Sequence, residues 1–333
     1  MQNRALIVGI DDYGDSSLTG CVRDAVSIAE LMETNADGSP NFQVRLLTSD
    51  ETEVTSELLD RKIRELFATG CDTAFFYFAG HGLLDADLEK GYLVAQDGKP
   101  PHWGVQLNDL VKLANDAHSR IKSVVIMLDS CHSGVAGADA LDNASDISKI
   151  GTGLTILAAC RSKETAKEEL QGGGGIFTNL VVDALRGGAS DVLGRTTPAS
   201  VYAFIDQTLG AWGGQRPVYK ANVDEFIVLR TVPPRVPLST IRLLPKWFEE
   251  AGSIYSLDPT YEEDRKNVDP TESLPEPIDE HVQIFKHLQT CNRNGLIDPV
   301  QAEHMYYAAM NSTGCRLTAA GAHYWKLAKN KLI

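Results

Sequence analysis

The stretch Ser123–Gly134, SVVIMLDSCHSG, decides the fold of this chain. Its apolar run ends abruptly in small residues and one reactive side chain, Cys131, which is typical of a buried strand in a parallel sheet. Ala74–Gly82, AFFYFAGHG, has the same form and presents His81, 50 residues before the cysteine. If the two strands are neighbours, the thiol and the imidazole emerge at one carboxyl edge, where α/β sheets place their chemistry.

Strand-like and helix-like segments alternate outward from these two strands over residues 1–230. Such alternation predicts an α/β fold, with a mostly parallel sheet flanked by helices on both faces. The expected strands cover residues 4–10, 42–47, 74–81, 92–95, 123–131, 154–159 and 225–229, and the expected helices cover residues 20–34, 52–69, 107–118, 177–186 and 198–209.

The pattern changes after Arg230. Val232–Pro237, VPPRVP, is rich in proline, and Ser256–Pro277 is acidic, contains proline and is poor in apolar residues, which predicts a linker or arm over residues 231–277. Residues 278–333 have helical spacing again and predict a small, mainly helical C-terminal unit. Its last stretch, LTAAGAHYWKLAKNKLI, resembles the final helix of small winged-helix modules.

Length, hydrophobic content and net charge limit the class of protein to which this chain can belong. With 333 residues, 43% of them hydrophobic, the chain can bury a sizeable core. Its net charge of −14 argues against coating nucleic acid or an anionic membrane. Residues 281–333 hold six Lys and Arg against two Asp and Glu, but without a basic stripe we favour a docking or regulatory role for them over nucleic-acid binding.

The apolar runs and the arrangement of the cysteines indicate where in the cell the protein is expected. No run of 18 apolar residues exists, so no membrane span is expected. The six cysteines are scattered along the chain, as in proteins with reduced thiols, and predict a cytoplasmic protein.

Cys131 and His81 suggest a reactive pair only because of their context. A buried cysteine is usually a small core residue, and a lone histidine is more often structural. Here both residues end strands beside glycines, and the histidine precedes the cysteine by the interval noted for caspases. A thiolate beside an imidazole is the minimal unit for nucleophilic attack on an acyl carbon.

Several further stretches point to the same family. ALIVGIDDY at 5–13, LTGCVRDA at 18–25, FYFAGHG at 76–82 and LDSCHSG at 128–134 stand in the order and spacing of caspase-like cysteine peptidases. The chain resembles peptidase family C14, specifically its metacaspase-like and bacterial members, over roughly residues 1–230. GIFTNLVVDAL at 175–185 and a closing strand at 225–229 fit the small-subunit half of that family.

The resemblance implies the caspase-hemoglobinase fold, hydrolysis of peptide bonds and a role for each matching residue. Cys131 matches the nucleophile, and His81 matches the base that activates it and then protonates the leaving amine. The backbone N–H groups of Gly82 and Cys131 would form the oxyanion hole. His132 points away from its neighbour on an extended segment, so we interpret it as structural.

Two acids are the candidates for choosing the substrate. Asp129 precedes Cys131 by two residues and so points to the same side of the strand. In metacaspases the aspartates matching Asp24 and Asp129 line the pocket for the residue before the cut bond, and Cys21 matches its edge. Paired carboxylates in a cleft favour a cation, which predicts Arg or Lys in the substrate. Alternatively, Asp24 is an ordinary first-turn helix acid and Asp129 a turn residue.

Calcium is left open. Many metacaspases hold Ca²⁺ through acids after the catalytic histidine, and Asp85, Asp87 and Asp97 are weak candidates for ligands here. The segment lacks the dense acidic run of that family, so a solvated loop is favoured and no cofactor is expected to be required.

The sequence therefore predicts a cytoplasmic, bacterial cysteine endopeptidase that cuts protein substrates after Arg or Lys. We expect it to be a zymogen, held latent until a partner protein, proteolysis or an ion activates it. The resemblance suggests regulated proteolysis in bacterial defence or cell death. The alternative is a catalytically silent caspase-fold scaffold, against which intact His81 and Cys131 argue.

Overall fold

The computed structural model describes residues 3–85, 90–131, 150–159, 175–210, 217–264 and 273–333, and for residues 84, 85 and 131 it describes the backbone alone. The chain divides into two compact units, which meet between Pro233 and Pro234. This boundary lies three residues beyond the end expected for the α/β domain.

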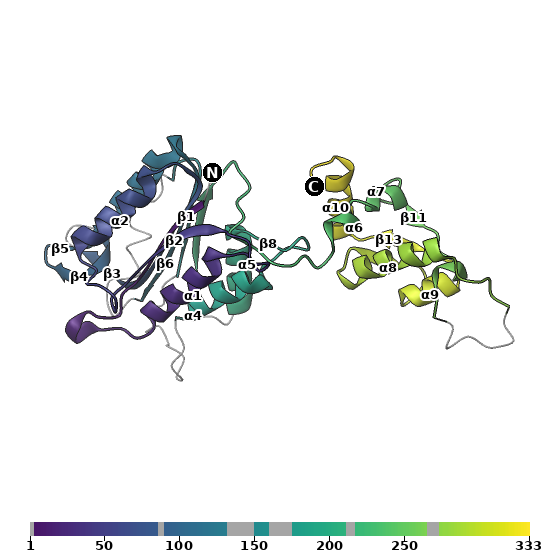
Figure 1. The fold of residues 1–333 in the computed structure, drawn as a ribbon, viewed down its shortest axis with the longest axis horizontal. Coiled ribbons are helices and arrows are strands. Elements are labelled where there is room, and N and C mark those ends of the chain that lie inside the picture. Colours follow the sequence, from purple (N-terminus) through teal and green to yellow (C-terminus); the bar gives the residue numbers. More distant parts are fainter. Residues whose placement is uncertain (1–2, 86–89, 132–149, 160–174, 211–216, 265–272) are drawn as a thin grey trace. The chain divides into compact units, whose positions relative to one another are not determined.

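The first unit is built on one sheet of eight strands (Figure 1). Five parallel strands and one antiparallel edge strand, β9, follow the order β2-β1-β3-β6-β7-β9, and a hairpin of β4 and β5 extends from β3. Its strands are β1 (Asn3–Gly9), β2 (Phe42–Thr48), β3 (Cys71–Asp85), β4 (Lys90–Lys99), β5 (His102–Gln106), β6 (Ile121–Cys131), β7 (Leu154–Ala158) and β9 (Val218–Asn222).

Helices cover both faces of this sheet, as predicted (Figure 1). Side chains alternate along β3, so Phe76 faces a core shared with α2 and α3, whereas Phe75 faces a core shared with α1, α4 and α5. Both phenylalanines are fully buried. The helices are α1 (Cys21–Glu33), α2 (Ser56–Ala68), α3 (Leu107–Asp116), α4 (Ile176–Asp183) and α5 (Pro198–Leu209).

The prediction of a closing strand at 225–229 is wrong. The edge strand is β9, which pairs antiparallel with β7 through residues 218–222. Ile227 and Leu229 are buried in the core, and the chain next pairs β10 (Arg230–Thr231) with β8 (Arg195–Thr196) in a separate two-stranded sheet. The apolar residues at 225–229 therefore include side chains that are buried in the core, although this segment forms no strand of the main sheet.

The second unit includes much of the predicted linker. Between residues 238 and 255 the structure places α6, α7 and β11, and Leu244 and Phe248 are fully buried. The Trp325 indole N–H donates a hydrogen bond of 2.8 Å to the Phe248 carbonyl. Residues 234–264, which the structure describes, therefore belong to the core of this unit rather than to a linker.

Helices and a small sheet share the second unit. β11, β13 and β12 form a three-stranded antiparallel sheet, which the sequence did not predict because its strands have only two or three residues. The elements are α6 (Leu238–Ile241), α7 (Leu244–Trp247), β11 (Ile254–Tyr255), α8 (Asp279–Arg293), β12 (Ile297–Pro299), α9 (Met305–Met310), β13 (Cys315–Leu317) and α10 (Ala319–Lys329).

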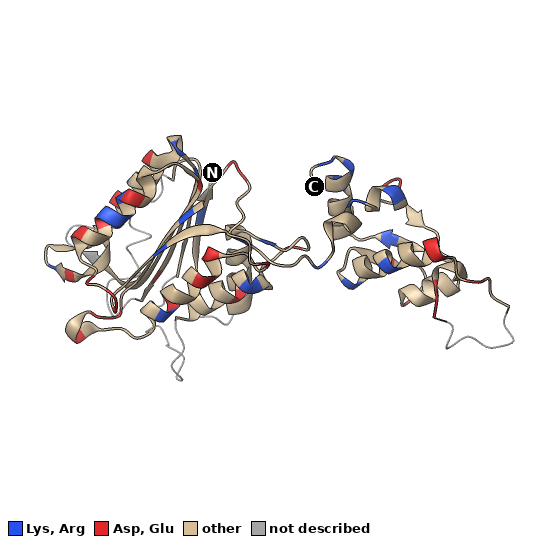
Figure 2. Cartoon of the chain, in the orientation of Figure 1, with Lys and Arg blue, Asp and Glu red and all other residues tan. Residues whose placement is uncertain are grey.

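Acidic and basic residues are mixed on the surface of the protein. Figure 2 shows Lys and Arg interspersed with Asp and Glu on the helices, while the strands of the large sheet are mostly uncharged. Within the described ranges, every helix is too short or too polar to cross a bilayer.

Candidate active site

The two candidate catalytic residues are brought together by strand register. β3 and β6 are adjacent and parallel, and His81 lies directly opposite Cys131 in their pairing. Both residues are at the carboxyl end of the sheet, as expected from the way each apolar run ends. Because the two strands are hydrogen-bonded neighbours, the Cys131 backbone and the His81 backbone are one strand spacing apart, about 5 Å.

The His81 imidazole is fixed by a backbone carbonyl. Its Nε2 atom lies 2.6 Å from the carbonyl oxygen of Ser16, and the side chain is only 9% exposed. Since a carbonyl oxygen only accepts hydrogen bonds, Nε2 is the protonated nitrogen that donates. In the neutral ring, Nδ1 is then the nitrogen able to take a proton. The Ser16 contact therefore selects the tautomer of the candidate base.

Tyr13 holds His81 from a second side. The Tyr13 and His81 rings lie 4.6 Å apart between centroids. The Tyr13 hydroxyl accepts a hydrogen bond of 3.1 Å from the His81 backbone N–H and donates one of 3.1 Å to the Val94 carbonyl. A Cβ atom at Gly80 would lie 2.5 Å from the Tyr13 oxygen, which explains why glycine precedes the histidine.

The loop that carries Tyr13 and Ser16 is anchored at the start of α1. Asp11 accepts hydrogen bonds from the backbone N–H groups of Cys21, at 2.8 Å, and Val22, at 3.2 Å. These N–H groups have no partner within the helix, so a carboxylate there satisfies them and favours the helix dipole. Asp11 thereby ties the loop beside His81 to the helix that bears Asp24.

Asp24, Asp129 and Cys21 surround one small cavity. Asp24 comes from the first turn of α1 and Asp129 from the end of β6, two residues before Cys131. Both side chains are 5% exposed. The cavity has a volume of about 20 Å³ and is lined by Leu18, Thr19, Cys21, Asp24, Ala79, Asp129 and Gly175.

Hydrogen bonds attach the two carboxylates to the start of α4. The Gly175 N–H donates to Asp24 Oδ2 at 2.8 Å, and the Thr178 hydroxyl donates to Asp129 Oδ2 at 2.5 Å. Because the Thr178 proton is directed to Asp129, the Tyr77 hydroxyl, 2.6 Å from Thr178 Oγ1, is the donor of that contact. Asp129, Thr178 and Tyr77 thus form a buried chain of hydrogen bonds.

Burial makes the ionised form of both acids unfavourable. It raises the pKa of Asp24 from 3.8 to about 6, a rise opposed by the Gly175 hydrogen bond and increased by the charge of Asp129. Burial likewise raises the pKa of Asp129 against the effect of the Thr178 hydrogen bond, and it raises the pKa of Tyr77 well above its ordinary value. Two desolvated carboxylates facing one cavity would be stabilised by a cation.

Of the three calcium candidates, Asp97 is the one whose side chain the structure describes. The Asp97 carboxylate accepts hydrogen bonds from the Ser56 N–H, at 2.7 Å, and the Ser56 hydroxyl, at 2.8 Å, where α2 begins. Asp87 lies outside the described residues, and Asp85 is described by its backbone alone. Among the described residues, no group of three or more His, Cys, Asp or Glu could hold a metal ion.

Two further predicted features have limited structural description. Gly82 lies in β3, where it pairs with Leu93 of β4 next to the His81 position. His132 lies outside the described residues.

Sequence reasoning missed the residues that orient the site. Tyr13 ends the stretch ALIVGIDDY, Ser16 follows it by three residues, and Thr178 lies in GIFTNLVVDAL, but the sequence pattern predicts no role for any of the three. Their contacts span 65 residues for Ser16 with His81 and 49 for Thr178 with Asp129. One signal was present, since a glycine directly before a strand-end histidine indicates that another group packs against that position.

Comparisons with known proteins give one family and one fold. A family model of the caspase domain matches residues 2–223. Among solved structures, caspase-1 from Spodoptera frugiperda matches with a TM-score of 0.50 and 14% identity, over 69% of this chain and 92% of that one. A protein from Geobacter sulfurreducens matches with a TM-score of 0.49 and 16% identity, over 70% of this chain and 98% of that one. No match was found among curated proteins.

Proposed function

Because the chain belongs to the caspase domain family, a family of cysteine peptidases, we propose that it is a cysteine endopeptidase that cleaves after Arg or Lys. The expected caspase fold is confirmed, with a mostly parallel sheet flanked by helices. The observation that carries the specificity is the cavity shared by Asp24 and Asp129, next to the strand that ends in Cys131.

The proposed reaction begins with proton transfer within the dyad. Nδ1 of His81 takes the proton of the Cys131 thiol, while Nε2 keeps its hydrogen bond to the Ser16 carbonyl. The thiolate attacks the peptide carbonyl carbon to form a tetrahedral intermediate, whose oxyanion would accept hydrogen bonds from the N–H groups of Gly82 and Cys131. The intermediate then collapses with cleavage of the C–N bond, the imidazolium protonates the leaving amine, and a thioester to Cys131 remains. Water hydrolyses this thioester and releases the carboxylic acid and the Cys131 thiol.

In this proposal the substrate side chain supplies the positive charge that compensates Asp24 and Asp129 in the cavity. A guanidinium or ammonium group between Asp24 and Asp129 compensates two carboxylates whose ionisation is otherwise opposed by burial. The guanidinium of Arg can donate to both carboxylates at once, whereas Lys presents a single point charge. We therefore expect Arg to be preferred over Lys, and both over Asp.

Several finer proposals rest on the sequence alone. We propose a cytoplasmic, bacterial protein that is latent until a partner, proteolysis or an ion activates it, and that acts in regulated proteolysis. A requirement for Ca²⁺ is not part of the proposal, because the segment after His81 lacks a dense run of acidic residues.

The test is a cleavage assay on fluorogenic peptides that differ only in a terminal Arg, Lys or Asp, with and without Ca²⁺. We expect cleavage after Arg and Lys, no cleavage after Asp, and loss of all activity in Cys131→Ser. Cleavage after Asp in preference to Arg would contradict the pocket assignment, and unchanged activity in Cys131→Ser would contradict the nucleophile. A protein that cleaves none of them, even after limited proteolysis, would support the scaffold alternative.

A further inference from the structure

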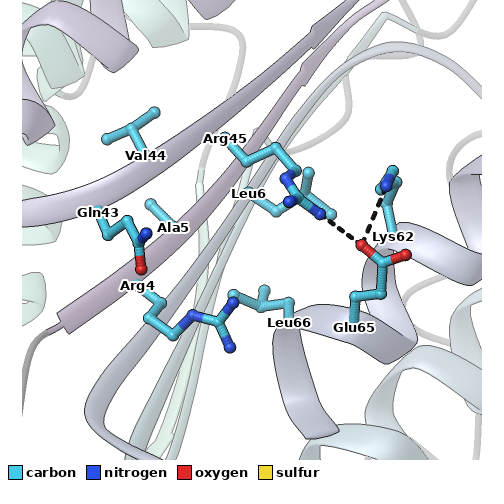
Figure 3. Close-up of a pocket in the computed structure, with 9 residues that line it drawn as sticks. All are labelled: Arg4, Ala5, Leu6, Gln43, Val44, Arg45, Lys62, Glu65 and Leu66. Atoms are coloured by element: carbon cyan, nitrogen blue, oxygen red, sulfur yellow. Dashed lines mark hydrogen bonds and ion pairs between the residues drawn. The ribbon is translucent and has the colours of Figure 1, made fainter. Parts of the chain in front are cut away.

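A second cavity lies in the first unit, away from the candidate active site. It has a volume of about 180 Å³ and opens between β1, β2 and α2 (Figure 3). Arg4 pairs with Ala74 on β3, seven residues before His81 in the same strand. At about 3.3 Å per residue, the cavity is therefore roughly 20 Å from the candidate base.

The side chains around this second cavity are mainly cationic. Arg4 comes from β1, Arg45 from β2 and Lys62 from α2, and the one carboxylate among the described residues of the lining is Glu65. Glu65 is paired with both Arg45 and Lys62, the latter at 3.0 Å (Figure 3). The hydrogen bond from Lys62 lowers the pKa of Glu65, so this carboxylate is ionised at neutral pH. The lining therefore carries a net charge of +2.

Arg4 is the residue that points to a ligand. Its Nη1 atom is buried and has no hydrogen-bond acceptor among the described residues. The Arg4 side chain extends across the cavity toward α2, while Glu65 is directed to Arg45 and Lys62 (Figure 3). A buried guanidinium N–H without an acceptor is unfavourable, because it has lost its water without gaining a partner. Because Arg4 lines the cavity, an acceptor placed there would lie beside its guanidinium group.

We propose that this cavity binds a phosphoryl group, as inorganic phosphate or as a small phosphate monoester. A dianion matches the net charge of the lining. Its several oxygens can accept from the planar guanidinium of Arg4 and from the cations at the mouth together. Arg45 has a half-exposed side chain and Lys62 a mostly buried one, so a ligand can enter past Arg45 and reach Arg4. Ala5, Leu6, Val44 and Leu66 complete the lining.

The test is isothermal titration of the full chain with inorganic phosphate, repeated with glycerol 3-phosphate and with chloride at equal ionic strength. We expect saturable binding of phosphate and none of chloride. Arg4→Gln and Lys62→Gln should each weaken binding by about tenfold or more, because each removes a charge-assisted hydrogen bond. If glycerol 3-phosphate binds at least as tightly as phosphate, the ligand is a monoester; if it binds more weakly, the ligand is the free ion.

The opposite substitution separates a built site from general surface charge. Glu65→Gln frees two cations and should tighten phosphate binding, whereas the matched Asp60→Asn on the same helix should not. Asp60 pairs with Arg64, and neither residue lines the cavity. Equal effects of the two substitutions, or phosphate affinity that is unchanged in Arg4→Gln, would overturn the proposal. So would the absence of binding to the wild-type protein. None of these readouts depends on peptidase activity.

Discussion

Replacing Asp24 by Asn should make the protein more stable while removing its proposed specificity. In the folded protein burial raises the pKa of Asp24 from 3.8 to about 6. At pH 7.5 the carboxylate is ionised in both the folded and the unfolded chain, so the folded state bears the full penalty. A shift of about two units corresponds to about 3 kcal/mol, and solvent at the cavity mouth reduces the expected gain to about 2 kcal/mol.

The size of this stabilisation depends on pH. The pKa of Asp24 is higher in the folded than in the unfolded protein, so protonation of its carboxyl group favours the folded state. This contribution to stability is complete below pH 4 and is lost as the pH rises through 6. The advantage of Asp24→Asn should therefore fall to about a third of its value when the pH is lowered from 7.5 to 4.5. Asn keeps an oxygen to accept the Gly175 N–H, so no hydrogen bond need be lost.

The measurement is the free energy of unfolding in denaturant at both pH values, with Glu30→Gln as the control. Glu30 is exposed on the same helix, and its substitution should change stability by less than about 0.5 kcal/mol. A stability gain that does not vary with pH, or a loss of stability at pH 7.5, would refute the electrostatic reasoning. In the same variant, cleavage after Arg and Lys should disappear.

Three other substitutions test the contacts around the site and the second unit. Tyr13→Phe removes a hydrogen bond to the His81 backbone and should lower kcat/KM about tenfold, with the largest change in kcat, as steady-state kinetics would show. Thr178→Val removes the donor to Asp129, raises the pKa of that acid further and should shift the pH profile for Arg peptides upward. Trp325→Phe removes a buried indole hydrogen bond and should destabilise the second unit by about 1 kcal/mol, measured by hydrogen exchange in that unit. An unchanged pH profile in Thr178→Val, or an unchanged kcat in Tyr13→Phe, would contradict the roles given to these residues.

The sequence predicted the central sheet because its strands have a strong local signal. The runs ending at His81 and Cys131 are continuous and apolar, and a strand buried on both faces needs that composition. The sequence predicts the closing strand at 225–229 because residues 226–229, FIVL, form a continuous apolar run, whereas β9 reads VYKAN and is interrupted by polar residues. Edge strands carry fewer buried side chains, so their pattern is weaker.

The linker prediction failed for a related reason. The prolines of Val232–Pro237 and the low apolar content of Ser256–Pro277 predict a segment unable to form a core. Leu244, Phe248 and Leu257 are nonetheless almost completely buried, and α6 and α7 pack against α10, which follows them by more than 70 residues in the sequence. The amino-acid composition of one segment does not reveal such packing against residues that are distant in the sequence.

The candidate site was predictable in its reactive groups but not in their support. His81, Cys131, Asp24 and Asp129 were found from strand ends and from the resemblance to a family. The Ser16 carbonyl that selects the tautomer of His81 is a backbone group, which leaves no trace in residue type.

The most direct measurement of the central claim is covalent labelling by peptidyl acyloxymethyl ketones, which react with a thiolate and displace a carboxylate. Probes bearing Arg or Asp next to the ketone would be compared, and the modified cysteine identified by mass spectrometry. We predict that the Arg probe modifies Cys131, that the Asp probe does not, and that His81→Ala abolishes labelling. Equal labelling by the two probes, or modification of another cysteine in place of Cys131, would contradict the account.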